Sequence, residues 1–176
     1  MSKKYLIFFI TVLIFFASVN MATNSINIKP KYYEPHEERV ESLYELGLQG
    51  SHALEKKRIT LQGFHDPEPF GRWTSESASI IGNLNPIIKG RTVILCGFAF
   101  VPNIGVTGVL KIADSTYDIK FSSEESCHEF IYDGGRVTKD VVIDGFTTKT
   151  PVEIGINNDT RELGVAIFQL SSAFIV

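Results

Sequence analysis

The chain has 176 residues, 44% hydrophobic and 21% charged, which is the composition of one globular domain and excludes a disordered chain. The formal charge is −3, and loss of Lys3 and Lys4 with a leader leaves 15 basic against 20 acidic residues, or −5. An acidic chain without a basic stripe argues against a nucleic-acid partner, because phosphate binding depends on clustered Lys and Arg.

Residues 1–23 are predicted to be a signal peptide or a membrane anchor. Lys3 and Lys4 precede a mostly apolar run from Tyr5 to Val19, which is the pattern of a secretory leader. The segment Asn20-Met21-Ala22 is a poor cleavage site, so an uncleaved anchor with the lysines inside is the alternative. In either case we expect the rest of the chain outside the cytoplasm, periplasmic or secreted, or held at the inner membrane.

Residues 24–58 are predicted to be a linker followed by a short helix. Pro30 and Pro35 favour an extended chain up to residue 35. Beyond it, apolar residues recur at helical spacing, and Gly47 and Gly50 are expected to end the helix. This helix is interpreted either as a solvated element on the domain surface or as a docking helix for a membrane partner. The helical spacing is that of Val40, Leu43, Tyr44 and Leu48.

Residues 59–176 are predicted to form the folded domain, an all-β antiparallel sandwich of jelly-roll type. Residues 91–100 are apolar on both faces, as in a central strand, while 117–121 alternate as in a half-buried strand. Turn signals separate many short strands, and no helical stretch lies between them. The other expected strands are 59–62, 106–113, 127–132, 137–143, 152–156 and 164–170.

The chain contains two cysteines, Cys96 and Cys127. In an oxidising compartment they could form a disulfide. Alternatively Cys96, which lies in an apolar run, is a small buried hydrophobe. Neither cysteine has the paired spacing that a zinc site requires, so no metal is expected.

The loop 63–74 contains the chain's only tryptophan and has two interpretations. In the first, Trp73 or Phe70 stacks on a sugar ring, as aromatic walls do in binding sites. In the second, Trp73 plugs one end of the sandwich as a core residue. The polar residues of the loop are His65, Glu68 and Arg72, which supply hydrogen bonds to sugar in the first interpretation. In the second, Glu68 and Arg72 form an internal ion pair.

A second candidate segment is the turn at 157–162. It is either an ordinary strand connection or a site where Arg161, beside Asp159, binds a ligand carboxylate or phosphate. Catalysis is not expected, because Asp66 and Glu68 are only two positions apart and no nucleophile with a partnered base is present. No cofactor is expected either.

Four motifs carry a family resemblance. The segments 68–74, 98–103, 150–156 and 158–165 resemble, in order, those of the C-terminal extracytoplasmic β-domain of bacterial membrane phosphoglycerol transferases. These enzymes modify periplasmic glucans, and related domains occur in other glycan-modifying membrane proteins. The resemblance covers residues 63 to about 170, so it implies the accessory domain alone, and we expect no sulfatase-like catalytic domain in this chain. The matching positions are Glu68, Arg72, Trp73, Asn103, Asp159 and Arg161, and Phe70 stands where the family usually has Trp.

The resemblance and the residues together predict a non-catalytic accessory domain of the cell envelope that binds an envelope polysaccharide or oligosaccharide. The alternative is a protein-interaction module that docks, through residues 35–50, on a polytopic membrane protein that modifies glycans. A third hypothesis, which the residues favour least, is a small glycan hydrolase. The predicted glycan-binding residues are His65, Glu68, Phe70, Arg72, Trp73, Asn103, Asp159 and Arg161.

Overall fold

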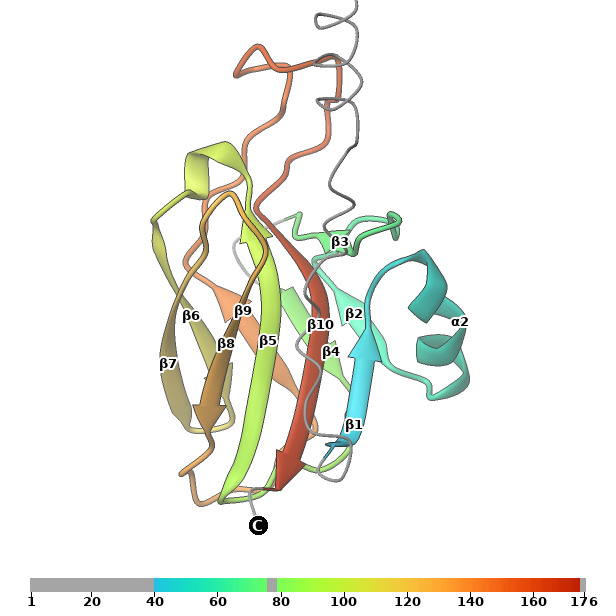
Figure 1. Ribbon diagram of the computed structural model, residues 1–176, viewed down its shortest axis with the longest axis vertical. Helices are drawn as coiled ribbons and strands as arrows, with labels where there is room; N and C mark the ends of the chain where they lie inside the picture. The colour runs from blue at the N-terminus through green and yellow to red at the C-terminus, as the bar shows by residue number, and fades with distance from the viewer. Residues whose placement is uncertain (1–39, 76–78, 175–176) are drawn as a thin grey trace, which may run out of the picture. The chain divides into compact units, whose positions relative to one another are not determined.

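The computed structural model describes residues 40–75 and 79–174, which form a sandwich of two antiparallel sheets (Figure 1). The leader at 1–23 and the linker up to residue 39 lie outside the described residues. In sheet A the order is β1-β10-β5-β8, and β3 also pairs with β10. Its strands are β1 (Val40–Glu45), β3 (Arg72–Trp73), β5 (Arg91–Ala99), β8 (Ser126–Ile131) and β10 (Val165–Phe174).

Sheet B has the order β2-β4-β9-β6-β7. Its strands are β2 (Thr60–Gln62), β4 (Ser79–Gly82), β6 (Thr107–Ile112), β7 (Ser115–Lys120) and β9 (Val141–Asp144). Along the chain, the strands cross repeatedly from one sheet to the other, as in jelly-roll folds. The predicted all-β antiparallel sandwich is therefore confirmed.

The core lies between the facing surfaces of the two sheets. In β5 and β10, Leu95 pairs with Leu170, and both side chains are buried against residues of sheet B such as Leu110 and Ile143. The opposite face of β5 carries Ile94 and Cys96, which pack in a separate cluster with Phe168. The apolar run at 91–100 is thus buried on both of its faces, as its sequence predicts.

The prediction of a helix through Val40–Leu48 is wrong. Residues 40–45 form β1, which pairs with β10 in sheet A, so the sheet includes residues assigned above to the linker segment. From residue 42 to 46 burial alternates, with Tyr44 and Leu46 buried and Leu43 exposed. Apolar residues four apart satisfy both a helical period and a strand's period of two, and pairing with β10 selects the strand.

The helix of this region, α2, begins later, at Leu48–Lys56. Gly50, expected to end a helix, lies inside it because α2 packs tightly against the end of β1. A Cβ atom on Gly50 would lie 2.0 Å from the carbonyl oxygen of Glu45. Only glycine therefore fits at this contact.

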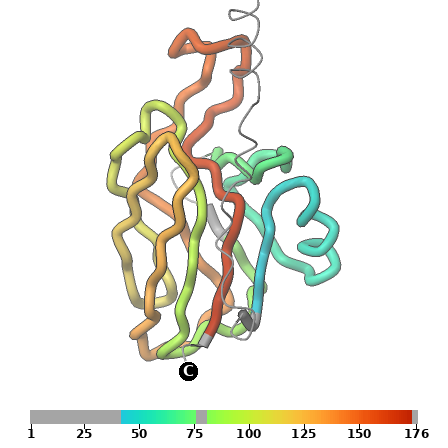
Figure 2. Tube along the Cα trace, viewed as in Figure 1, coloured from blue at the N-terminus to red at the C-terminus, as the bar shows by residue number. Residues whose placement is uncertain are grey.

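The strand predicted at 152–156 is also absent. Residues 151–155 form successive turns, with Gly155 at a positive φ of 72°. Its alternating apolar residues have no neighbouring strand, and Val152, Ile154 and Ile156 are exposed instead. This loop, the loop that contains the 3-10 turn η1 (Val101–Asn103) and the hairpin containing β3 lie toward the same end of the sandwich (Figures 1 and 2).

Candidate functional site

The predicted tryptophan loop is a hairpin whose close approach to β10 fixes its position. His65 donates its backbone N–H to the carbonyl of Trp73 (2.9 Å), and Glu68 and Gly71 close the tip through two backbone hydrogen bonds. Trp73 pairs with Ala166 of β10. A Cβ atom on Gly71 would lie 2.6 Å from the carbonyl oxygen of Ile167, so glycine allows the hairpin to lie against the strand.

Trp73 lies in an aromatic cluster formed with Phe70, Phe98 and Phe100. The centroid of its ring lies 5.8, 5.3 and 5.8 Å from those of the three phenylalanines, with interplanar angles of 76°, 79° and 72°. Such edge-to-face contacts favour a fixed arrangement of the rings. Phe100 is buried, whereas Trp73, Phe70 and Phe98 are partly exposed. Trp73 is therefore neither a free platform nor a fully buried core residue.

Arg161 joins the hairpin to the long loop between β9 and β10. Its Nη1 lies 2.9 Å from Glu68 Oε1, and its Nη2 lies 2.7 Å from Asp159 Oδ2. The Nε atom also donates to both carboxylate oxygens of Asp159. These hydrogen bonds hold the pKa of Asp159 down to about 2 and raise the pKa of Arg161. The structure thus brings the two predicted site segments together through an ion-pair network.

The predicted ion pair between Glu68 and Arg72 does not form. Arg72 instead donates from Nε to the carbonyl of Leu46 (3.1 Å), from Nη1 to that of His65 (3.1 Å) and from Nη2 to Ser51 Oγ (3.3 Å). Partial burial lowers the pKa of Arg72, with Asp66 and Glu55 opposing the shift. Arg72 therefore connects the hairpin to the chain around α2, and these contacts use three of its five N–H donors.

His65 connects the same two loops. Its Nε2 atom lies 2.7 Å from the carbonyl oxygen of Glu162, and this nitrogen must carry the proton, because a carbonyl only accepts. His65 is partly exposed, and it also contributes to the lowered pKa of Asp159 in the network.

Asn103 is not a surface ligand residue, contrary to the sequence prediction. Its exposed fraction is 0%. Its Nδ2 donates to the carbonyls of Thr147 (2.6 Å) and Gly164 (3.1 Å), while its Oδ1 accepts from the backbone N–H of Thr147 (3.0 Å) and from its hydroxyl (3.2 Å). The residue ties the η1 turn to both ends of the long loop and has no capacity for a bound molecule.

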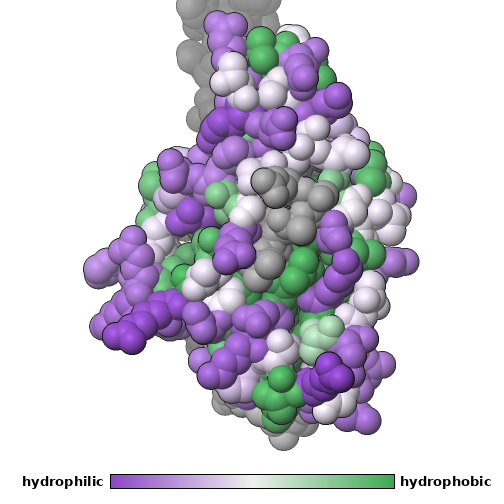
Figure 3. All heavy atoms as spheres, turned by 180° about the vertical axis from the view of Figure 1, so that it is seen from behind, coloured by the Kyte–Doolittle hydropathy of each residue, from purple (hydrophilic) through white to green (hydrophobic). Residues whose placement is uncertain are grey.

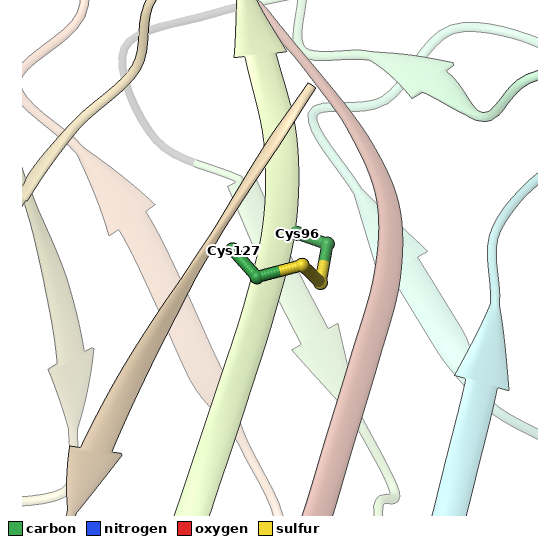
Figure 4. The surroundings of a disulfide bond; sticks show 2 residues. All are labelled: Cys96 and Cys127. Carbon is green, nitrogen blue, oxygen red and sulfur yellow. A yellow bond between two sulfur atoms is a disulfide. The ribbon is translucent and has the colours of Figure 1, made fainter. Parts of the chain in front are cut away.

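Cys96 and Cys127 form a disulfide, which decides between the two interpretations of these residues (Figure 4). They face each other directly on β5 and β8 of sheet A. The bond lies on the face of the sheet turned away from sheet B, with Ile94 and Phe168.

Sequence reasoning missed Phe98 as a member of the site. Its alternation with Cys96 along β5 places both on the same face, and Phe98 contacts Phe70 at 5.4 Å between ring centroids. The strand's period of two could have placed Phe98 on the face of Cys96. The run at 91–100 is apolar on both faces, so its sequence does not distinguish one face from the other.

Residues 40–75 and 79–174 contain no group of three or more His, Cys, Asp or Glu side chains placed to hold a metal ion. Within the same ranges, no helix reaches the length and apolarity needed to cross a bilayer.

Comparison with curated proteins and with solved structures gives no match to the chain. The sequence model of one family, described as "Domain of unknown function (DUF7024)", matches residues 43–173. The match begins within β1 and ends within β10, so it covers both sheets and both loops of the candidate site. The chain therefore belongs to the DUF7024 family.

Proposed function

We propose that the chain is a non-catalytic accessory module of the bacterial cell envelope, and that it binds glycan over a surface formed by Phe70, Trp73 and Phe98 beside the Arg161 network. One observation carries the proposal: partly exposed aromatic rings lie next to a fixed set of charged groups. Sites for small polar ligands combine aromatic walls with a few placed polar groups.

The polar groups of this surface are preorganised by one another. The side chains of Arg161, Glu68 and Asp159 are 41%, 26% and 23% exposed, so part of each faces solvent while their mutual bonds fix their positions. Arg161 fills the acceptor positions of Asp159, so a bound sugar would use those that remain on Glu68. Little side-chain freedom would then be lost on binding.

The electrostatics of the network favour binding over hydrolysis. A general acid near neutral pH needs a raised pKa, whereas the pKa of Asp159 is about 2 because Arg161 hydrogen bonds to it. Glu68 is bound to the same guanidinium. Asp159 is therefore suited to remain ionised and unsuited to donate a proton.

The proposed location outside the cytoplasm is supported by the disulfide between Cys96 and Cys127, since such bonds persist in oxidising compartments. The predicted leader at 1–23 points to the same compartment. The sequence resemblance to the accessory domain of phosphoglycerol transferases supplies the envelope-glycan setting.

The test is calorimetric titration of the full chain in nanodiscs with a panel of envelope polysaccharides. We expect saturable, sub-millimolar binding to one class and about tenfold weaker binding by Phe70→Ser, corresponding to about 1.4 kcal/mol. Leu48→Ser, at an exposed position on α2, is the matched control and should bind as the unmodified chain does. Equal affinities for the Phe70 and Leu48 variants would place the site elsewhere.

A second candidate function is docking on a polytopic glycan-modifying membrane protein, as the alternative sequence interpretation predicts. A groove of about 240 Å³ between β1 and α2 favours it, lined by Leu43 and Ala53 among others, with exposed Leu48 on the same helix. A photo-crosslinker at Ala53 should then capture one defined polytopic protein in cells, whereas one at Val137 should not. Equal capture from both positions would count against this candidate.

A further inference from the structure

Exposed aliphatic side chains are concentrated on two loops at one end of the sandwich. Nine large hydrophobic residues are exposed within the described ranges, and five of them lie on these loops, with exposed fractions between 37% and 56%. The remaining four, Leu43, Leu48, Ile131 and Val137, are distributed over other parts of the domain. The five residues are Val101 in η1, Ile104 directly after it, and Val152, Ile154 and Ile156 on the loop between β9 and β10.

The two loops are joined at their bases, so they act as one unit. Asn103 binds Thr147 and Gly164 at the two ends of the long loop, and Lys149 and Leu163 form a β-bridge across it. The long loop projects from the sandwich in Figures 1 and 2, and apolar residues are visible among polar ones along this projection in Figure 3. The apolar side chains are therefore presented on a defined support.

The backbone at the tip of the long loop is hydrogen-bonded within the loop. Val152 donates to the carbonyl of Asp159 (3.1 Å), Glu153 to Thr150 (3.1 Å), Gly155 to Val152 (3.2 Å) and Ile156 to Pro151 (3.0 Å). A segment that enters a low-dielectric medium must satisfy its backbone donors internally. This tip meets that requirement at four of the five positions between 152 and 156.

The charge of the long loop indicates whether a lipid contact would depend on attraction to anionic headgroups or on apolar side chains. Residues 147–163 contain Lys149 and Arg161 against Glu153, Asp159 and Glu162, a net charge of −1. All three carboxylates and the arginine are engaged within the loop. Arg161 binds Asp159, Glu153 accepts from the Thr150 N–H, and Glu162 accepts from the Thr148 hydroxyl. No basic cluster is available to attract anionic headgroups, so contact with a membrane would rest on the apolar side chains.

We propose that these two loops insert shallowly into the interface of a lipid bilayer, with Val152, Ile154 and Ile156 as the leading residues. The predicted N-terminal leader or anchor would bring the domain to the extracytoplasmic side of such a surface. Insertion is independent of the charge of the lipid. The proposal does not rest on glycan binding, which uses the neighbouring aromatic surface.

The experiment places a tryptophan at the tip and measures its quenching by brominated phosphatidylcholine in nanodiscs that hold the full chain. Trp73→Phe removes the only native tryptophan, and Ile154→Trp then reports on the tip. The matched control is Val137→Trp, because Val137 is 66% exposed and lies in the segment between β8 and β9, at the opposite end of the sandwich. We expect at least threefold stronger quenching at 154 than at 137, unchanged when 30% phosphatidylglycerol is added.

Equal quenching at the two positions, or quenching at 154 that requires phosphatidylglycerol, would overturn the proposal. Absence of quenching at position 154 would also overturn the proposal. In that case a protein, and not a lipid bilayer, would be the partner of the two loops. If the Trp73→Phe variant does not fold, hydrogen exchange of the unmodified chain can show instead which end of the sandwich contacts the bilayer. The nanodisc should then protect residues 150–158 more than residues 133–140, and equal protection would contradict insertion.

Discussion

Asn103→Ala should destabilise the domain substantially, because the side chain is a buried connection between loops and contacts no ligand. It takes part in four hydrogen bonds, and its exposed fraction is 0%. A buried hydrogen bond contributes about 1 kcal/mol net. Thr147 is exposed and Gly164 O also accepts from the Phe100 N–H, so water and the remaining bond recover part of the loss. The expected loss is about 3 kcal/mol, out of the roughly 5–15 kcal/mol typical of a domain.

The assay is urea unfolding followed by circular dichroism. With a slope of about 2 kcal/mol/M, the midpoint should fall by about 1.5 M without a change in the slope. Asn158→Ala, at an exposed position on the same loop, is the control and should change stability by less than about 0.5 kcal/mol. A loss below about 1 kcal/mol for Asn103→Ala, accompanied by weaker glycan binding, would refute the structural role and return Asn103 to the ligand site.

Three further predictions follow from individual contacts. Replacing Cys96 and Cys127 together by alanine removes a disulfide between residues 31 apart in sequence. The free energy of unfolding, measured by urea titration, should fall by about 3–4 kcal/mol. A loss under about 1 kcal/mol would mean that the bond is dispensable. The pKa of Asp159 is depressed to about 2, so its stabilisation is present above about pH 4 and is lost as the pH falls toward 2. The difference in thermal midpoint between the unmodified chain and Arg161→Gln should shrink over that interval, and a constant difference would contradict the pairing. Gly50→Ala should lower the thermal midpoint, because the Cβ of alanine would lie 2.0 Å from Glu45 O. This clash should outweigh the helix preference of alanine over glycine, which is about 1 kcal/mol. A raised midpoint would disprove this packing.

Local sequence patterns predicted most of the strands. They failed where the spacing of apolar residues fits both a helix and a strand. The alternation at Tyr117, Ile119 and Phe121 predicted β7, because burial on one face follows directly from a period of two. The spacing of Val40 and Tyr44 fits a helix and a strand equally, and pairing with the distant β10 decided between them. At 152–156 the alternation was present without a neighbouring strand, so a turn formed.

The candidate site was only partly predictable for a related reason. Loop composition singled out Trp73, Glu68 and Arg161 as candidate residues, but the choice of ion-pair partner depends on how distant segments meet. Arg161 reaches Glu68 only because the long loop folds onto the hairpin, and Arg72 turns instead toward Leu46 and Ser51. No rule based on sequence neighbours contains that information.

The central claim is that the aromatic surface beside the Arg161 network binds an envelope glycan. The most direct measurement is a titration of the full chain in nanodiscs that follows the fluorescence of Trp73, whose signal belongs to one place because the chain has a single tryptophan. A saturable spectral shift with one class of polysaccharide, weakened by Phe70→Ser, is the predicted result. No shift with any polysaccharide, while circular dichroism shows a folded domain, would contradict the claim.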